Sequence, residues 1–170
     1  MIEFKLENRR LRLIDDEFYS REFNNKGEET KKEKWSKVTF FESAAGYLTC
    51  NLTLNKVNHV LFQHRLVWYA HNQCWDIWDI SRDNSIDHIN QNKKDNRIAN
   101  LRKATHSENL QNKDCKGCYF KKANNKWVAQ ININGKVKHI GCYDTEEEAH
   151  EAYLAEKRIH HPFFVENEEL

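Results

Sequence analysis

The sequence predicts an α+β protein in which short antiparallel sheets alternate with short helices. Two segments, 46–54 and 127–133, alternate apolar and polar side chains as half-buried strands do. The dipeptide Asn134–Gly135 favours a two-residue hairpin turn. Thr105 with Glu108, and Thr145 with Glu148, have the spacing of capping boxes, which begin helices. A chain of 170 residues can hold one ordinary core or two to three small modules.

Residues 1–80 form the first predicted region. The stretch 24–34 is polar and charged, which predicts a loop, and the first 35 residues suggest no function. Residues 46–54 turn at Asn55–Lys56 and return through 57–62, which predicts a hairpin. Residues 64–71 (HRLVWYAH) then predict a short helix.

Residues 81–114 are rich in Asp, Asn, Lys and Arg, and their isolated apolar residues predict a small motif that carries a site. The last part, 105–112, predicts a short helix. Residues 115–165 then predict a three-stranded antiparallel sheet backed by one helix. The strands are 118–122, 127–133 and 136–143, and the helix runs from Thr145 to about His160 before Pro162 ends it. On that helix, Ala149, Ala152, Tyr153 and Glu156 fall on one side.

Charge is spread unevenly along the chain, although its net value is only +1. Residues 82–140 hold 13 basic and 5 acidic side chains, whereas residues 141–170 hold 2 and 9. This asymmetry fits either a site for a polyanion or a solvated basic face beside an acidic helix.

Membrane and redox signals point to a reduced, cytoplasmic protein. No run of about 18 apolar residues is present, and the N-terminal segment has no apolar stretch of the signal-peptide kind. The five cysteines are odd in number and scattered, which favours free thiols in a reducing compartment.

Residues 87–109 (DHINQNKKDNRIANLRKATHSEN) contain the groups that phosphodiester hydrolysis requires. A neutral imidazole such as His88 can activate water. Asp87 and Asn109 offer a carboxylate and an amide oxygen, a donor pair suited to Mg²⁺, which keeps several waters. Because neighbours on a strand point to opposite faces, Asp87 and His88 require a bulge, or a metal at the strand's end, to act together.

Residues 64–112 resemble the HNH endonucleases of the phage homing type. The resemblance rests on HRLVW (64–68), DHIN (87–90), DNRIANLR (95–102) and ATHSEN (104–109). It implies a ββα-metal fold, with two short strands and a helix around one divalent ion. Asp87 and Asn109 would be metal ligands, His88 the general base, and Asn100 the residue that holds the strand pair and orients the base. Asn at the last position favours Mg²⁺ or Mn²⁺, and zinc is not expected.

Several of these residues have a second interpretation. Asn100 is also suited to a purely structural role, Asn109 to a surface amide, and His106 to an alternative metal ligand. His64 is expected to be packed and hydrogen-bonded rather than catalytic. Arg97 and Arg102 either contact phosphate or brace the loop.

Residues 117–161 resemble the plant APETALA/ethylene-response DNA-binding domain, through KGCYF (116–120), KWVAQI (126–131), HIGCYDTEEEA (139–149) and AY (152–153). The resemblance implies that the exposed sheet face enters the DNA major groove. The side chains expected on that face are Tyr119, Lys121, Gln130, Asn132 and His139. The plant domains carry more Arg and Trp there, and a merely solvated face is the alternative.

Cys115 and Cys118 form a C-x-x-C pair, for which His139 and Cys142 are conceivable partners in a structural zinc site. Cys118 and Cys142, however, occupy positions where the resembling domain has small or apolar residues.

The sequence therefore predicts a metal-dependent, site-selective DNA endonuclease of the homing type. It would be phage-encoded, act on double-stranded DNA in the cytoplasm of a bacterial host, and be a monomer or a homodimer. A non-catalytic DNA-binding regulator is the alternative, followed by a zinc-stapled interaction module.

Overall fold

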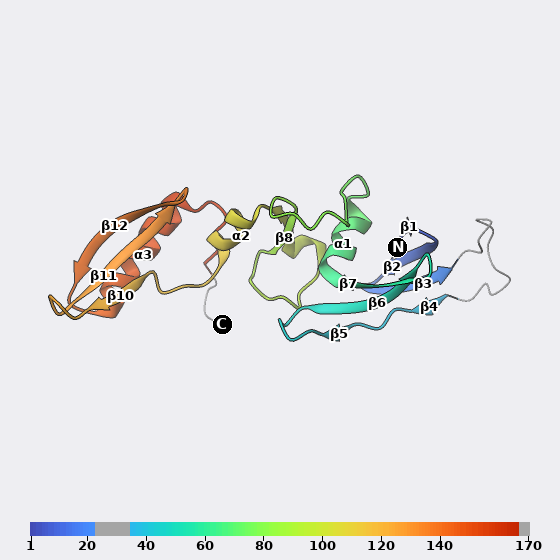
Figure 1. The fold of residues 1–170 in the computed structure, drawn as a ribbon, viewed down its shortest axis with the longest axis horizontal. Coiled ribbons are helices and arrows are strands. Elements are labelled where there is room, and N and C mark those ends of the chain that lie inside the picture. The colour runs from blue at the N-terminus through green and yellow to red at the C-terminus, as the bar shows by residue number, and fades with distance from the viewer. Residues whose placement is uncertain (23–34, 167–170) are drawn as a thin grey trace. The chain divides into compact units, whose positions relative to one another are not determined.

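A computed structural model describes residues 1–22 and 35–166 as an α+β protein with small antiparallel sheets and short helices (Figure 1). The loop predicted at 24–34 lies outside the described residues. The chain divides into two compact units, Met1–Lys103 and Ala104–Leu170. Among the described residues, no helix has the combination of length and apolar character that crossing a membrane requires.

The first unit begins with a meander of four strands in the order β1-β2-β3-β4. These strands are β1 (Ile2–Leu6), β2 (Arg9–Ile14), β3 (Glu17–Glu22) and β4 (Ser36–Lys37). Asp15 and Asp16 have φ angles of 47° and 63° and make the tight turn between β2 and β3. Sequence analysis assigned no structure to this part of the chain, yet its alternating apolar residues are buried in the core of the unit. They are Phe4, Leu6, Leu11, Leu13 and Phe18.

The predicted hairpin and helix of the first region are confirmed. β6 (Leu48–Leu54) pairs with β7 (Val57–Phe62), and β5 (Phe41–Glu42) lies at the other edge of β6. Asn55 and Lys56 form the turn with φ angles of 48° and 68°. Helix α1 (Gln63–His71) follows β7 directly and buries Leu66, Val67 and Ala70 in the same core as the strands.

Two short strands carry the polar motif. β8 (Ser85–His88) and β9 (Leu101–Ala104) form a two-stranded sheet, and the short 3-10 helix η1 (Ile98–Asn100) precedes β9. Ile86 and Leu101 are buried in the core of the first unit, so each strand is anchored by an apolar side chain. The loop 89–97 that joins β8 to η1 is mostly polar.

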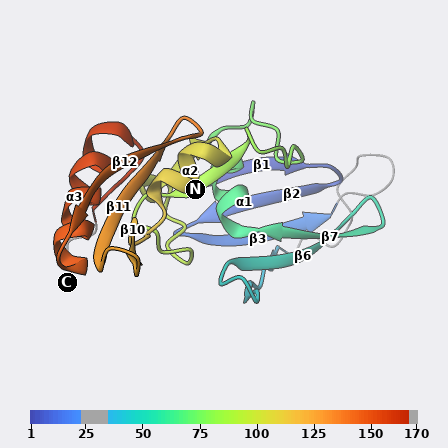
Figure 2. The same ribbon diagram turned by 60° about the vertical axis from the view of Figure 1, so that its left-hand side comes forward.

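The second unit contains helix α2 (His106–Asn112), strands β10 (Cys118–Lys121), β11 (Lys126–Ile133) and β12 (Lys136–Tyr143), and helix α3 (Glu146–His160). The strands form an antiparallel sheet in the order β10-β11-β12, and α3 packs along one face of it, as both ribbon views show (Figures 1 and 2). The predicted sheet, hairpin turn and helices are therefore present. Asn134 and Gly135 adopt φ angles of 52° and 79° at the turn.

The two predicted capping boxes differ. At Thr105 both bonds form, from Glu108 N to Thr105 Oγ1 (3.2 Å) and from Thr105 N to Glu108 Oε2 (2.7 Å). At Thr145 the hydroxyl accepts from Glu148 N (3.2 Å), but Glu148 Oε2 accepts from Asp144 N (3.3 Å). The reciprocal bond has thus moved back by one residue, and α3 still begins where the sequence predicts.

Candidate active site

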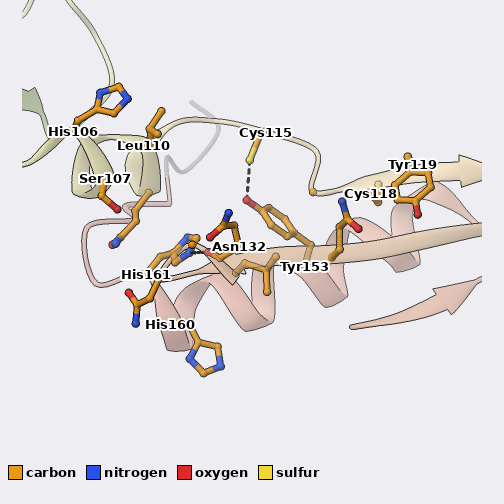
Figure 3. A pocket seen from close by; sticks show the side chains of 16 residues that line it. His106, Ser107, Leu110, Cys115, Cys118, Tyr119, Asn132, Tyr153, His160 and His161 are labelled. Atoms are coloured by element: carbon orange, nitrogen blue, oxygen red, sulfur yellow. Dashed lines mark hydrogen bonds between the residues drawn. The ribbon is translucent and has the colours of Figure 1, made fainter. Parts of the chain in front are cut away.

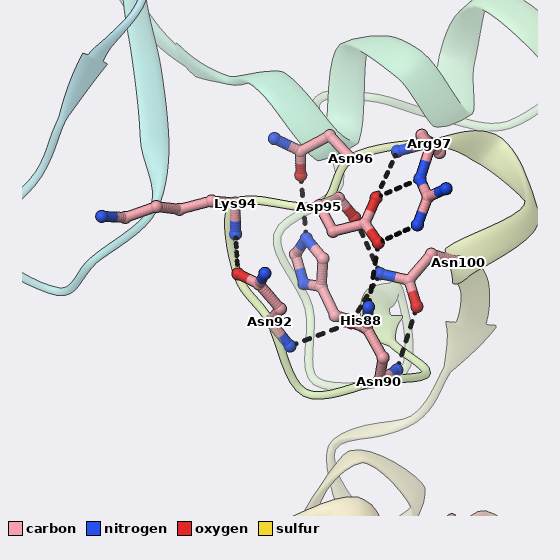
Figure 4. A network of polar contacts seen from close by, with 8 residues as sticks. All are labelled: His88, Asn90, Asn92, Lys94, Asp95, Asn96, Arg97 and Asn100. Carbon is pink, nitrogen blue, oxygen red and sulfur yellow. Dashed lines mark hydrogen bonds and ion pairs between the residues drawn. The ribbon is translucent and has the colours of Figure 1, made fainter. Parts of the chain in front are cut away.

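His88 is the last residue of β8 and is almost fully buried, with 5% of its surface exposed. Its Nε2 atom lies 2.8 Å from Oδ1 of Asn96, and Asn96 in turn donates from Nδ2 to Oε1 of Gln63 at 3.0 Å. Figure 4 shows the Asn96 amide directed at the ring from the loop that follows β8. A hydrogen bond to Asn96 therefore holds the ring in one orientation.

Two further rings pack against His88. The ring of His64, from the first turn of α1, meets it edge-on at 5.2 Å between centroids, with an interplanar angle of 72°. Tyr47 lies 6.0 Å from His88 and 5.3 Å from His64. His64 is packed, as expected, but the hydrogen bond expected for it is missing at Nδ1. That atom is buried and has no hydrogen-bond partner among the described residues.

Burial keeps both imidazoles neutral at neutral pH. It lowers the pKa of His88 below 6.5, while the hydrogen bond to Asn96 and the charge of Asp87 act in the opposite direction. Burial, with a smaller contribution from His88, lowers the pKa of His64 to about 3. A neutral His88 is the form that can accept a proton from water.

Asp87 precedes His88 on β8 and is buried. It forms an ion pair with Arg102 of β9. Arg102 contacts the same carboxylate oxygen, Oδ2, through Nε at 2.9 Å and through Nη2 at 2.7 Å. The side chain of Asp87 is only 6% exposed, and that of Arg102 is 22% exposed. Arg102 therefore pairs with Asp87 across the two strands β8 and β9.

The Asn100 side chain holds together the two ends of the polar loop 89–97. Its Nδ2 atom donates to Asn90 Oδ1 (2.8 Å) and to the carbonyl of Asp95 (2.7 Å), and its Oδ1 accepts from Asn90 N (2.9 Å). Figure 4 shows these contacts closing the loop next to His88. These contacts give Asn100 the role of a staple that holds the loop closed.

Arg97 is engaged within the same loop. Its guanidinium donates to both carboxylate oxygens of Asp95, at 2.7 and 2.6 Å, while its side chain stays 70% exposed. The hydrogen bond from Arg97 lowers the pKa of Asp95 to about 2. The pair is thus ionised at neutral pH, with the cation turned to solvent.

Asn109 and His106 both lie on α2 and belong to the second unit, whereas Asp87 and His88 belong to the first. Asn109 is half-buried and His106 is exposed. Within the described part of the chain, no three His, Cys, Asp or Glu side chains are grouped so as to hold a metal ion. A Mg²⁺ site needs only one or two protein oxygens, and the predicted donors, a carboxylate and an amide, have the right chemistry for it.

The cysteines considered for zinc have different partners. Cys115 Sγ lies 2.7 Å from the hydroxyl of Tyr153, and Cys118 Sγ contacts the carbonyl of Glu146 at 3.9 Å. Cys142 Sγ lies 3.7 Å from Nε2 of His139. All five thiols of the chain are free.

The side chains expected to face DNA are all exposed on the β10-β11-β12 sheet: Tyr119, Lys121, Gln130, Asn132 and His139. Gln130 pairs with His139 across β11 and β12, after a register shift between Ala129 and Gln130. Ala129 and Ile131 are buried, and Lys138 reaches Glu156 of α3, which marks the opposite face. Alternation along the strands therefore separates an open face, which carries these five side chains with the buried Val128 and the exposed Val137, from the face that α3 covers.

A cavity of about 590 Å³ lies in the second unit, among α2, β11 and the end of α3 (Figure 3). Asn132 and Tyr119 of the open face take part in its lining, together with Leu110, Tyr153 and His161. His161 closes one side of it by a contact of 2.9 Å from Nε2 to the carbonyl of Asn132. Sequence analysis did not predict this cavity, because its walls come from segments far apart in the chain.

Sequence analysis also missed Gln63 and Asn96. Asn96 lies inside the DNRIANLR stretch, whereas Gln63 immediately precedes HRLVW and falls one residue outside the segment 64–112. Nothing in their residue types distinguishes them from the many other amides nearby, and only the contact between them reveals their position beside His88.

Comparison with known proteins gives one match, to a family model described as HNH endonuclease, over residues 62–111. No curated protein and no solved structure matches the chain. The matched segment runs from the end of β7 to α2 and contains Asp87, His88, Asn100 and Asn109. Residues 62–111 of this chain are therefore similar to the HNH endonucleases, a match that supports a nuclease.

Proposed function

We propose that the protein is a metal-dependent DNA endonuclease that hydrolyses phosphodiester bonds, with His88 as its general base. The observation that carries the proposal is the setting of His88. Its ring is buried, kept neutral and held by Asn96, and it follows Asp87 within the segment that matches the HNH endonuclease model.

The hydrogen bond to Asn96 indicates which ring nitrogen is basic. Because Asn96 Oδ1 is an acceptor, His88 Nε2 must donate, and the lone pair of the neutral ring is then on Nδ1. In the proposed reaction Nδ1 takes a proton from water. The hydroxide attacks the phosphorus, and the bond from phosphorus to the 3′ oxygen breaks.

Asp87 and Asn109 are the proposed ligands of one Mg²⁺ or Mn²⁺ ion. Both offer oxygen, the donor that these hard cations prefer, whereas zinc prefers nitrogen and sulfur. A carboxylate has two oxygens, so Asp87 can bind Arg102 and a cation together. A bound cation would neutralise charge on the phosphate and on the leaving oxygen. β8, β9 and α2 follow one another in the order of a ββα-metal motif.

Contacts to the DNA backbone are proposed for Arg97 and Arg102. Arg97 has the more exposed guanidinium, and its pairing with Asp95 fixes the direction in which it points. Arg102 would reach phosphate while it also braces Asp87. Asn100 is proposed to support catalysis by stapling the loop that carries Asn96.

The second unit is proposed to bind the DNA major groove through its open sheet face, as the APETALA/ethylene-response domains do. Gln130 and Asn132 can form paired hydrogen bonds with adenine edges, and Lys121 can reach guanine or phosphate. With this anchor in residues 115–165, and residues 1–80 completing the nuclease part around 81–114, we propose site-selective, homing-type cleavage. A phage origin and action in the host cytoplasm belong to the same proposal.

The function is tested by incubating supercoiled plasmid or phage DNA with the full chain, with Mg²⁺ or Mn²⁺ and then with a chelator. Nicked or linear products that appear only with the cation support the proposal. One centre cuts one strand, so a monomer should nick, and a double-strand break requires a homodimer or two visits. DNA that stays supercoiled under every condition contradicts a nuclease.

A non-catalytic DNA-binding regulator is favoured by one observation, the ion pair between Arg102 and Asp87, which already satisfies the buried carboxylate without a metal. A regulator would bind the same DNA with unchanged affinity after chelation and would leave it intact.

A further inference from the structure

We infer that Gln63 and Asn96 are positioning residues that fix the protonation of the His88 ring, so that Nδ1 is its basic nitrogen. This inference rests on the proposed nuclease function for its consequence in catalysis. Its physical core, a directed chain of hydrogen bonds ending at His88, can be tested whether or not the protein cleaves DNA.

The chain of hydrogen bonds consists of two contacts, between side chains that lie close together only in the folded protein. Asn96 Nδ2 donates to Gln63 Oε1 at 3.0 Å, over a sequence separation of 33 residues. Asn96 Oδ1 lies 2.8 Å from His88 Nε2. Both Asn96 and His88 are buried, with 7% and 5% of their surfaces exposed, so water cannot easily replace either partner.

The direction of the hydrogen-bond chain follows from the orientations that the Gln63 and Asn96 amides have in the structure. An asparagine side chain has one donor end and one acceptor end. Since Gln63 presents an oxygen to the donor end, the acceptor end is the one that faces His88. His88 must then carry its proton on Nε2. If the Asn96 amide rotated by half a turn, its NH₂ group would require the opposite tautomer of His88, with the proton on Nδ1.

The hydrogen-bond chain begins at Gln63, on the first turn of helix α1. Gln63 is its first residue, and His64, the second, packs edge-on against His88. Arg65, the third, donates to the carbonyls of Ile77 and Asn84 in the segment that leads into β8. The first turn of α1 thus contacts the His88 region at three consecutive residues, and burial of Leu66 and Val67 holds that turn in the core.

Gln63 distinguishes a positioning role from simple packing, because it is half-buried and its side-chain hydrogen bond goes to Asn96. Gln63→Ala removes the acceptor that orients Asn96. Gln63→Glu keeps an acceptor oxygen there, since an ionised carboxylate only accepts. Gln73→Ala is the matched control, since Gln73 is exposed just beyond α1 and makes no side-chain hydrogen bond within the described residues.

The experiment combines two readouts on the full-length variants. Long-range ¹H–¹⁵N spectra of ¹⁵N-histidine-labelled protein report which His88 nitrogen carries the proton, with His88→Gln used for assignment. Steady-state cleavage of supercoiled plasmid with Mg²⁺ reports kcat and KM separately. In wild type we expect the proton on Nε2. Gln63→Ala should populate the other tautomer and lower kcat by about 10²-fold with little change in KM. Gln63→Glu should recover much of that loss, and Gln73→Ala should behave as wild type.

An unchanged His88 tautomer in Gln63→Ala would overturn the inference, as would a wild-type ring protonated on Nδ1. An equal loss of kcat in Gln63→Ala and Gln63→Glu would also overturn it, because the acceptor oxygen would then be irrelevant. If wild type fails to cleave DNA but the His88 tautomer changes in Gln63→Ala, the hydrogen-bond chain from Gln63 to His88 is supported and the proposed nuclease function fails.

Discussion

Arg102 and Asp87 form a largely buried ion pair, with Nη2 of the arginine 2.7 Å from Oδ2 of the aspartate. The arginine therefore sits where a positive charge stabilises the carboxylate before any cation binds. Asp87 is also a proposed metal ligand, so the two positive charges should influence each other through this one side chain.

Arg102→Ala should lower the free energy of unfolding by about 2 kcal/mol, because a buried carboxylate loses a charged hydrogen-bond partner. Millimolar Mg²⁺ should then raise the midpoint of thermal unfolding more in this variant than in wild type. The matched control is Arg97→Ala, whose pair with Asp95 should contribute far less to stability because the guanidinium is exposed to solvent. Equal Mg²⁺ effects on the unfolding midpoint in all three proteins would contradict the assignment of Asp87 as a metal ligand.

Asn100→Ala should destabilise the protein by about 2 kcal/mol, because three side-chain hydrogen bonds close the loop after β8. Cleavage should fall as well, since the same loop carries Asn96. Chemical denaturation and plasmid cleavage measure the two effects. Asn92→Ala is the control in the same loop, where the Asn92 side chain accepts one hydrogen bond, from Lys94 N. A variant at Asn100 with wild-type stability would contradict the staple.

His64 should make the protein less stable in mild acid. Its pKa is about 3 in the folded protein and 6.5 when unfolded, so the unfolded chain binds the extra proton between these values. The stability is fully present above about pH 6.5 and is lost progressively as the pH falls toward 3. Between about pH 7 and pH 5, His64 should account for about 2 kcal/mol of the loss.

Denaturant unfolding of wild type and His64→Gln at the two pH values measures that share, because the variant lacks the titrating ring. His106→Gln, at an exposed histidine on α2, serves as the control. The explanation fails if His64→Gln loses as much stability as wild type on acidification.

Gln130→Ala and Asn132→Ala should weaken DNA binding without slowing the chemical step, because both side chains lie on the open sheet face of the second unit. Each should reduce the affinity for a specific site by about 1–3 kcal/mol if it contacts a base edge. KM would rise while kcat stays constant. Asn124→Ala, in the turn between β10 and β11, is the control; if it weakens binding as much as the other two, the sheet face is not the contact surface.

The sequence patterns predicted elements well where a strand, a turn and a cap agreed. The 46–62 hairpin and the Asn134–Gly135 turn are examples. The β1-β2-β3 meander was missed because its turns contain Glu7, Asp15 and Asp16 instead of glycine, although Asp can adopt the left-handed conformation found there.

Long-range contacts between polar residues were not predictable. The helix α3 was expected to pack through Ala149, Ala152, Tyr153 and Glu156, but the residue buried in place of Glu156 is its neighbour Lys157. The ammonium of Lys157 donates to the carbonyl of Lys113 at 2.8 Å and lies 4.2 Å from the ring centroid of Phe164. Likewise, His88 and Asp87 are neighbours in the sequence, but only the fold brings Asn96 to the His88 ring and Gln63 to Asn96.

The most direct test of the central claim is the rate of plasmid cleavage by His88→Ala in saturating Mg²⁺, measured together with its DNA affinity. If the ring at position 88 takes the proton from water, the rate should fall by about 10² to 10⁴-fold while the affinity stays unchanged. Cleavage at the wild-type rate by a folded His88→Ala protein would contradict the account.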